Sequence, residues 1–291
     1  MKLQDSNKNR RQMRTAIIDT GGGLRGVYAA GVLDHLIEKG VQFDLAIGVS
    51  AGSANLASFL AGQKGRNYIF YTQYAQRKEY MGIGNFVKNG SYVNLDYVYG
   101  TLSNSDGENP IDYPAIAANP AEFLIVATDA ETSEPVYFTK ADLSQDCYDV
   151  CKASAALPFA GPPYPIRGRV YYDGALSDPL PVHIALERGC TRIVMLVTSP
   201  RDIPRKSGTD RFFARGIARK YPLSARKMAQ RAELVNSELD RLREYERDGR
   251  LLIVAPDNSC GVRVLEKRRS RLEVLYRKGL SDAEIIEEYL G

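Results

Sequence analysis

Residues 43–61 read FDLAIGVSAGSANLASFLA, which predicts a strand, a sharp turn and a helix. Residues 43–49 are an almost continuous apolar run of strand length, as expected for a strand covered on both faces. Residues 51–61 are rich in Ala, Gly and Ser, so a helix there can lie close to a sheet. The turn between them, residues 48–52, follows the pattern Gly-x-Ser-x-Gly and exposes the Ser50 hydroxyl at the end of the strand. Ser50 is therefore a candidate nucleophile.

Steric crowding in the turn explains why glycines flank Ser50. A turn this sharp leaves no room for side chains at its flanks, which favours Gly48 and Gly52. The N-terminus of the helix that follows favours negative charge near the Ser50 hydroxyl. The pattern by itself is a modest signal in a glycine-rich chain, and the apolar strand before it and the helix after it supply the context that it needs.

A second glycine-rich turn comes earlier in the chain. Residues 15–19 predict a short buried strand, residues 21–26 read GGGLRG, and residues 24–38 predict a helix. This arrangement also matches the dinucleotide-binding pattern GxGxxG, which requires an acidic residue at the end of the next strand. The next strand ends at Ser50, and its acid, Asp44, lies at its start. A nucleotide-binding module is therefore disfavoured, and it remains the alternative from another class of function.

The other use of a glycine-rich loop before a helix is to stabilise an oxyanion. Backbone N–H groups that point at the developing negative oxygen lower the barrier to acyl transfer. The N–H groups of Gly22, Gly23 and Ala51 are the first candidates. The loop that carries the first two of these groups also contains Gly21, Arg25 and Gly26.

The base that would activate Ser50 has three candidates. His35 lies within an apolar helix, where a core or partly exposed histidine is the plainer interpretation. A triad of Ser50, Asp173 and His183 has the chain order of an α/β-hydrolase, but that fold places several strands before its nucleophile, whereas one precedes the Ser50 strand here. Asp173 follows a predicted strand, residues 170–172, and carboxyl ends of parallel strands meet at one edge. Asp173 is thus a candidate base that acts directly, although an ordinary Asp-Gly turn explains it equally well.

Taken together, these motifs resemble the patatin-like phospholipases. The segments GGGLRG at 21–26, GVSAG at 48–52 and DGA at 173–175 occur in the order found in that family. The segments ASAALPF at 153–159 and SDPLPV at 177–182 are similar to its bacterial members. The resemblance covers about residues 15–255. The sequence Asp19-Thr20 before the glycines departs from the residues more usual there.

The resemblance implies a catalytic mechanism and a class of substrate. It implies a Ser-Asp dyad without histidine, with Ser50 as nucleophile, Asp173 as base and residues 21–26 as the oxyanion loop. It also implies lipid acyl-ester substrates, with no metal or cofactor. We therefore expect a phospholipase A, lysophospholipase or carboxylesterase activity, with an acyltransferase that uses the same dyad as the alternative. A dyad without histidine predicts a rate profile with no inflection near the histidine pKa of about 6.5.

The predicted elements give an α/β fold of the patatin-like type, with three layers. Strands alternate with helices, which predicts a mostly parallel central sheet covered by helices on both faces. We expect one domain, residues 1–291, with a basic N-terminal arm at 1–14 and a charged, mostly helical insertion at 201–250. A C-terminal helix at 281–291 is expected to begin with a capping box of Ser281 and Glu284. The later strands are predicted at residues 123–127, 136–138, 170–172, 192–197 and 251–255.

Composition excludes several other functions. The net charge of +4 is small and gives no reason to expect a nucleic-acid partner. The chain has only two histidines, and its four cysteines contain no CxxC pair, so it offers few ligands for a zinc site. We therefore expect buried, reduced thiols and no metal. The longest apolar runs have strand length, short of the roughly 20 residues of a membrane span. Residues 1–14 do not resemble a secretory signal, so a cytoplasmic protein is expected.

One surface is predicted to contact membranes peripherally. Basic residues outnumber acids in residues 201–231, and Arg211, Arg215 and Arg219 recur at every fourth position, next to Phe212 and Phe213. A helix with these residues on one face would bind anionic lipid headgroups. A solvated charged helix is the plainer alternative. The sequence leaves the oligomeric state open.

Overall fold

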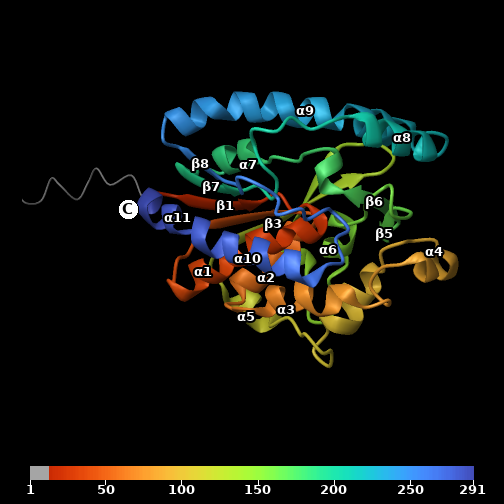
Figure 1. Ribbon diagram of the computed structural model, residues 1–291, viewed down its shortest axis with the longest axis horizontal. Helices are drawn as coiled ribbons and strands as arrows, with labels where there is room; N and C mark the ends of the chain where they lie inside the picture. The colour runs from red at the N-terminus through yellow and green to blue at the C-terminus, as the bar shows by residue number, and fades with distance from the viewer. Residues whose placement is uncertain (1–12) are drawn as a thin grey trace, which may run out of the picture.

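The computed structural model describes residues 13–291 and shows an α/β fold of three layers (Figure 1). The sheet of the middle layer is made of β1 (Thr15–Asp19), β2 (Leu45–Val49), β3 (Glu122–Asp129), β4 (Pro135–Thr139), β5 (Tyr164–Ile166), β6 (Arg169–Asp173), β7 (Arg192–Leu196) and β8 (Leu251–Val254). Its order is β5-β6-β3-β2-β1-β7-β8, and β4 also pairs with β3. The pairings from β3 to β8 along this order are parallel, whereas β4, β5 and β6 pair antiparallel. The prediction of a mostly parallel sheet is confirmed.

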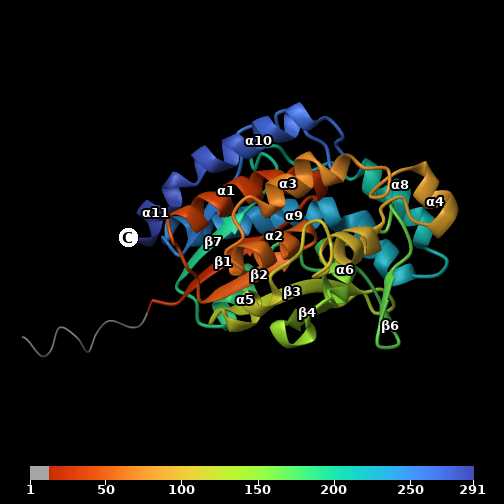
Figure 2. The ribbon, with the colours of Figure 1, turned by 90° about the horizontal axis from the view of Figure 1, so that it is seen from below.

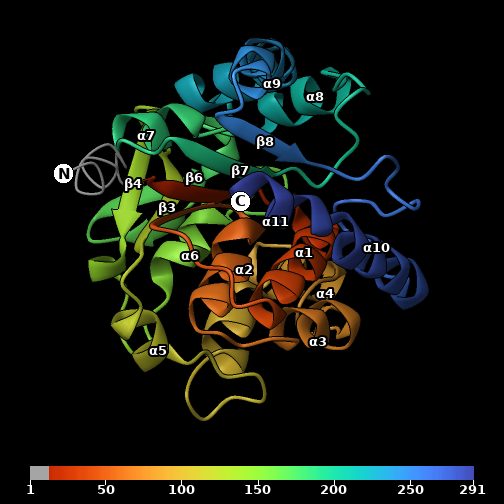
Figure 3. The same cartoon turned by 90° about the vertical axis from the view of Figure 1, so that its left-hand side faces the viewer.

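Helices cover both faces of the sheet (Figures 1 and 3). The α-helices are α1 (Val27–Glu38), α2 (Ala51–Leu60), α3 (Arg66–Thr72), α4 (Ile83–Asn89), α5 (Tyr113–Ala118), α6 (Asp149–Ser154), α7 (Val182–Glu187), α8 (Gly208–Ile217), α9 (Pro222–Arg247), α10 (Arg269–Asp282) and α11 (Glu284–Leu290). Shorter turns are the 3₁₀ helices η1 (Gly23–Gly26), η2 (Tyr74–Gln76), η4 (Lys140–Asp142) and η5 (Gly174–Leu176), and the π-helix η3 (Tyr97–Leu102). Helices α1, α2 and α10 lie on one face, and α7 and α9 on the other.

The alternation of side chains along β1 explains the two cores. Successive residues of a strand point to opposite faces. Ile17 packs in the core that holds α1, whereas Ala16 and Ile18 pack in the second core with Val235 of α9. All three β1 side chains are fully buried. A continuous apolar strand is therefore needed at the centre of the sheet.

Helices α1 and α10 approach each other closely and run side by side in Figure 2. A Cβ at Gly31 would lie 2.2 Å from the carbonyl oxygen of Tyr276, and a Cβ at Gly279 would lie 2.0 Å from that of Tyr28. The two glycines thus let the helix backbones touch. Further along, Nε2 of His35 lies 2.7 Å from Oε1 of Glu287 on α11.

Two predictions about helices are wrong. Ser281 lies in the last turn of α10, and α11 begins at Glu284 with no side-chain cap, so the capping box is not formed. The turn before it stays helical, with Gly279 packed on α1 and Asp282 accepting a hydrogen bond from the Tyr28 hydroxyl at 2.9 Å. Helix α8 ends at Ile217, so Arg219 lies in the turn beyond it and does not share a helix face with Arg211 and Arg215.

Some predictions fall outside what the structure describes. Residues 1–12 of the expected N-terminal arm are not among the described residues.

In the part of the chain from Met13 onward, no helix has the length and apolar character needed to cross a bilayer.

Candidate active site

Ser50 stands on a strained turn between β2 and α2. Its backbone has φ 57° and ψ −131°, a conformation that residues with a Cβ rarely adopt and that costs about 1–3 kcal/mol. Hydrogen bonds hold it there. The Ser50 N–H donates to Oγ of Ser154 at 2.9 Å, and the N–H and Oγ of Ser53 donate to the Ser50 carbonyl at 3.0 and 2.7 Å. Ser154 lies on α6 and was not predicted to support this turn.

The flanking glycines are required by close backbone contacts. A Cβ at Gly48 would lie 2.5 Å from Cα of Ser53, and a Cβ at Gly52 would lie 2.2 Å from the carbonyl oxygen of Asp19. Both distances are far below van der Waals contact. The flanks of the turn therefore have no room for a side chain, as predicted from the sequence.

Asp173 lies beside Ser50, but it arrives by a different route from the one predicted. The strand that carries it, β6, runs antiparallel to β3, and Asp173 pairs with Ala127. The preceding residue of β3, Val126, pairs with Val49, which comes just before Ser50. The expectation that carboxyl ends of parallel strands would bring the two residues together is thus wrong, because β6 reaches the site from the opposite direction.

The Asp173 carboxyl group is buried, with only 1% of the residue exposed. Its Oδ1 accepts a hydrogen bond from the Ala175 N–H at 2.9 Å. The Ser50 side chain lies close to the Asp173 carboxyl and lowers its pKa. Oδ2 of Asp173 has no hydrogen-bond partner among residues 13–291. Burial is the largest effect and raises the pKa of Asp173 to about 6. A carboxylate with a pKa near neutrality is suited to act as a general base.

The glycine loop takes a conformation that glycine favours, with φ of 66° at Gly21, 123° at Gly22 and 61° at Gly23. Asp19 shapes its first turn, since its Oδ1 accepts the Gly21 N–H at 2.9 Å. Its Oδ2 accepts Nδ2 of Asn55 at 2.9 Å, and burial raises the pKa of Asp19 to about 6. The aspartate that departs from the usual family sequence thus holds the loop in place.

Three backbone donors remain free around Ser50. The N–H groups of Gly22, Gly23 and Ala51 have no acceptor within the described chain. By contrast, the Leu24 N–H donates to the Val264 carbonyl at 2.8 Å. The free donors are those that sequence analysis named first. Backbone N–H groups without an acceptor are available to bind a negative oxygen.

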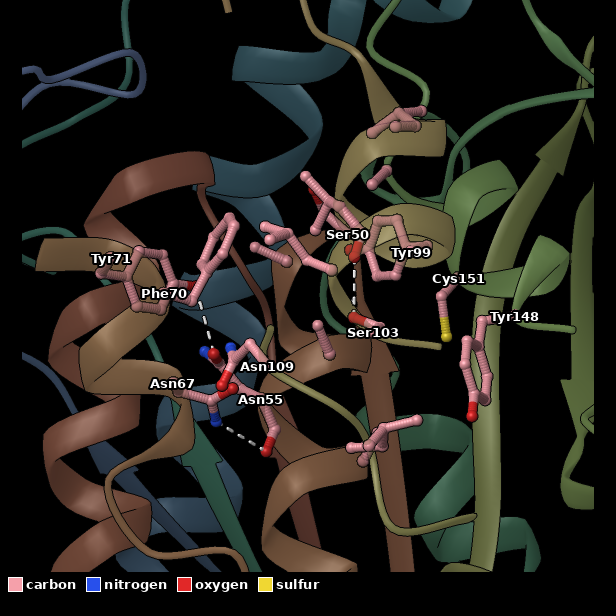
Figure 4. Close-up of a pocket in the computed structure, with 18 of the residues that line it drawn as sticks. Ser50, Asn55, Asn67, Phe70, Tyr71, Tyr99, Ser103, Asn109, Tyr148 and Cys151 are labelled. Atoms are coloured by element: carbon pink, nitrogen blue, oxygen red, sulfur yellow. Dashed lines mark hydrogen bonds between the residues drawn. The ribbon is translucent and has the colours of Figure 1, made fainter. Parts of the chain in front are cut away.

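A polar network under the loop was missed by the sequence analysis (Figure 4). Nδ2 of Asn55 also donates to the Gly26 carbonyl at 3.1 Å. Oδ1 of Asn55 accepts from the Tyr71 hydroxyl at 3.1 Å, and its carbonyl accepts from Nδ2 of Asn67 at 3.2 Å. Asn55 therefore ties the loop, α2 and α3 together. No local pattern marks it, because its partners lie on separate elements.

An apolar pocket opens at Ser50 (Figure 4). It holds about 1010 Å³ of free space, its open mouth included. Much of its wall is apolar or aromatic, including Phe70, Tyr80, Val93, Leu95, Val98 and Tyr99. Cys151 also lines it, and burial raises the pKa of this thiol to about 12, so it stays protonated. A pocket of this character fits an acyl chain.

Neither histidine belongs to the site. His35 pairs with Glu287, as described above. His183 is half-exposed, and its Nε2 lies 4.0 Å from Oδ2 of Asp178. In the described part of the chain, no hydrogen bond or ion pair joins either histidine to Ser50 or Asp173.

The segments that form this site lie within a match to a known protein family. Residues 20–186, more than half of the chain, match the family model of the patatin-like phospholipases. The chain belongs to the patatin-like phospholipase family. A second model, described as a domain of unknown function, matches residues 221–290. The division into a single domain with an insertion stays a prediction.

The names of the curated relatives of this chain state no activity. An uncharacterised Escherichia coli protein, YjjU, is 31% identical over 64% of this chain and 52% of its own length. An uncharacterised NTE family protein of Mycobacterium tuberculosis is 25% identical over 58% of this chain and 44% of its own. The chain thus spans about half the length of the curated relatives it matches. Among solved structures, VipD from Legionella pneumophila aligns with a TM-score of 0.49 and 13% identity, over 94% of this chain and 67% of that one.

Proposed function

We propose that this protein hydrolyses carboxylic esters of lipids with Ser50 as nucleophile and Asp173 as base. One observation carries the proposal. A buried aspartate, whose Oδ2 has no hydrogen-bond partner within residues 13–291, lies beside a strained serine, where an apolar pocket opens. Membership of the patatin-like phospholipase family supports the same class of reaction.

The chemistry proceeds in two acyl-transfer steps. Asp173 takes the proton of the Ser50 hydroxyl as Oγ attacks the acyl carbonyl, and the N–H groups of Gly22, Gly23 and Ala51 stabilise the oxyanion. One such donor lowers the barrier by about 2.7–4 kcal/mol. The protonated Asp173 then gives its proton to the leaving alcohol. Asp173 then deprotonates a water molecule that attacks the acyl carbon, and it returns this proton to Oγ of Ser50 as the bond between Oγ and the acyl carbon breaks and the fatty acid leaves.

The acceptor of the acyl group defines the alternative. An alcohol in place of water would make the same dyad an acyltransferase. Product analysis with and without added lysophospholipid separates the two, since a transferase yields a new diacyl lipid and a hydrolase yields only fatty acid. A nucleotide-binding role is not supported, because the pocket beside the glycine loop is apolar and opens at Ser50.

The enzyme is proposed to act on lipid at an anionic membrane surface. Helices α4 and α8 lie at the same end of the molecule in Figures 1 and 2. Helix α4 exposes Ile83, Phe86 and Val87, and α8 exposes Phe212 next to the cations Arg211 and Arg215. Phe213 does not join them, since its ring packs 5.2 Å from that of Phe159.

Covalent labelling tests the nucleophile. A fluorophosphonate probe is expected to label the full-length protein at Ser50, with loss of p-nitrophenyl-ester hydrolysis. Ser50→Ala should show neither labelling nor hydrolysis, whereas Ser237→Ala, at an exposed serine of α9, should keep both. Hydrolysis that persists in pure, folded Ser50→Ala protein would refute the assignment.

A further inference from the structure

An arginine lines the pocket that opens at Ser50, which we call the acyl pocket. Among the described residues that border this pocket, Arg66 of α3 is the one with a charge. Ser103 and Asn109 border it too and are polar but uncharged (Figure 4). Arg66 is partly buried. Because a charge in largely apolar surroundings is costly unless it is paired, the partners of Arg66 decide what it can bind.

Neutral oxygens hold the Arg66 guanidinium in place. Nε donates to the Pro110 carbonyl at 3.0 Å, and Nη1 donates to Oγ of Ser58 at 3.0 Å. Nη2 donates to Oγ of Ser103 at 2.9 Å and to the Asn109 carbonyl at 2.7 Å. These bonds use all but one of the N–H donors of the guanidinium, and the second N–H of Nη1 has no acceptor within residues 13–291.

The positive charge of Arg66 is not neutralised. Within residues 13–291 no carboxylate forms a hydrogen bond or an ion pair with it. The acid next to Asn109 in the sequence, Glu108, is instead paired with Arg77 through hydrogen bonds of 2.6 and 2.8 Å. Burial lowers the pKa of Arg66 to about 10, which still leaves it protonated at neutral pH. An anion that reaches this guanidinium would therefore gain a charge-assisted hydrogen bond.

Helix α2 relates the position of Arg66 to that of Ser50. The helix begins directly after Ser50, and its residues Ala51 and Asn55 border the acyl pocket. Ser58, which accepts Nη1 of Arg66, shares the helix face of Ala51 and Asn55. It lies roughly 12 Å from Ser50 along the axis, at about 1.5 Å per residue. An acyl chain that enters the pocket with its ester at Ser50 would therefore extend along α2 toward the Arg66 guanidinium.

We propose that Arg66 selects acyl chains that carry a carboxylate at the end remote from the ester. A guanidinium matches the geometry and charge of a carboxylate. A terminal carboxylate would take the remaining N–H of Nη1 and neutralise the charge, whereas a terminal methyl group would do neither. This proposal rests on the hydrolase function proposed above, because that function places the ester at Ser50. The substrates are then monoesters of dicarboxylic acids, and hydrolysis releases the dicarboxylic acid.

Ligand binding tests Arg66 without any catalysis. Full-length Ser50→Ala protein is titrated by isothermal calorimetry with monomethyl esters of dicarboxylic acids, from hexanedioic to tetradecanedioic acid. The methyl esters of the monocarboxylic acids of the same lengths are titrated for comparison. At the length that fits best, the ligand with the terminal carboxylate should bind at least about tenfold more tightly, and Arg66→Gln should abolish this preference. Equal binding of both ligands at every length, or an unchanged preference in Arg66→Gln, would overturn the proposal.

Gln63→Ala is the matched control, because Gln63 holds the same loop as Arg66 without a charge. Its Nε2 donates to the Pro110 carbonyl at 3.0 Å and its Oε1 accepts the Asp112 N–H at 3.0 Å, but Gln63 does not border the pocket. Gln63→Ala should keep the preference for the carboxylate. The same loss in Gln63→Ala and Arg66→Gln would assign the effect to the loop and contradict the proposal.

Arg66→Lys decides the matter if Arg66→Gln does not fold. This variant keeps a positive charge and loses the planar fork, so its preference for the carboxylate should be weaker than that of the parent. A preference as strong as in the parent would count against recognition by the guanidinium.

Ester hydrolysis separates this proposal from the proposed function. At the length that binds best, kcat/KM for the mono-p-nitrophenyl ester of the dicarboxylic acid is compared with that for the p-nitrophenyl ester of the monocarboxylic acid. The ratio should fall about tenfold in Arg66→Gln and stay constant in Gln63→Ala. Equal kcat/KM for both esters in the parent would refute selection by Arg66 and leave the hydrolase function in place. A calorimetric preference without any hydrolysis would refute the hydrolase function and leave the carboxylate site in place.

Discussion

At the scale of single residues, Ser50 and Asp173 have unfavourable conformations and surroundings that fit the reactive site proposed for them. Ser50 has a strained backbone angle, and Oδ2 of Asp173 is buried without a hydrogen-bond partner among residues 13–291. Strain and burial of this kind persist when the surrounding contacts overdetermine them, and they concentrate at active sites. The hydrogen bonds from Ser53 and Ser154 supply that support here.

Asp173→Asn is expected to abolish ester hydrolysis as fully as Ser50→Ala, because nucleophile and base act as one unit. His35→Gln and His183→Ala should keep most of the activity, since neither ring touches the dyad. The measurement is kcat/KM on a p-nitrophenyl ester, with Tm recorded for each variant. Asp173→Asn should be at least as stable as the parent at pH 8, because it removes a buried charge. Loss of activity in folded His183→Ala protein would instead support the triad.

The pH profile follows from the buried carboxyl. Burial raises the pKa of Asp173 to about 6, so the base is protonated below that pH. The value of kcat/KM should therefore rise with pH through an inflection near 6. The sequence alone predicted no inflection near the histidine pKa of about 6.5; we now expect one in that range, because burial raises the pKa of Asp173 to about 6. The same inflection in His35→Gln and His183→Ala assigns it to Asp173, and its disappearance in His183→Ala would contradict that assignment.

The sign of the stability effect is opposite to that of an ion-paired acid. A raised folded-state pKa means that ionising Asp173 and Asp19 costs stability. These two groups favour the native state below their unfolded pKa of about 4. Their contribution weakens as the pH rises from about 4 to 6. Burial of these two carboxyls therefore lowers the free energy of unfolding at neutral pH, where both are ionised.

At the scale of elements, the contact of α1 with α10 depends on two glycines. Gly31→Ala or Gly279→Ala would place a methyl group within 2.2 Å of a carbonyl oxygen on the other helix. Overpacking of this kind costs about 1–3 kcal/mol, more than the gain in helix propensity of up to about 1 kcal/mol. We expect a lower free energy of unfolding in denaturant titrations.

Gly216→Ala on α8 is the matched control, because nothing lies within 4 Å of its Cβ position. This variant should be unchanged or more stable by up to about 1 kcal/mol. Equal stability of all three variants would show that the α1–α10 contact is looser than described.

At the scale of the whole molecule, one end carries the apolar and basic groups proposed to meet the membrane. Helices α4 and α8 come from distant parts of the sequence and lie at that end together (Figure 1). Charge reversal of Arg211 and Arg215 should reduce co-sedimentation with phosphatidylserine vesicles, and salt should weaken binding of the parent, because surface charges are screened beyond about 10 Å at 0.1 M. Phe86→Ser should reduce binding with little dependence on salt.

Arg247→Glu is the control for this surface, since it reverses an exposed charge at the far end of α9. It should bind vesicles as the parent does. Binding that ignores phosphatidylserine content, or that falls equally in Arg247→Glu, would argue against a membrane-facing end.

The sequence by itself determined the strand–turn–helix units that carry Ser50 and the glycine loop. Those features follow from short-range sterics, because residues adjacent in the chain decide whether a sharp turn has room for a Cβ. The predicted strand at residues 15–19 matches β1, and Gly48 and Gly52 meet the backbone as argued. The motifs in their order also identified the family.

Only the tertiary structure decided how distant segments meet. The antiparallel direction of β6 and the Asn55 network depend on contacts between residues far apart in the chain. Strand direction leaves no trace in an apolar run, since both orientations bury the same side chains. The end of α8 before Arg219 and the passage of α10 through Ser281 were likewise set by packing, which overrides weak local signals for helix ends.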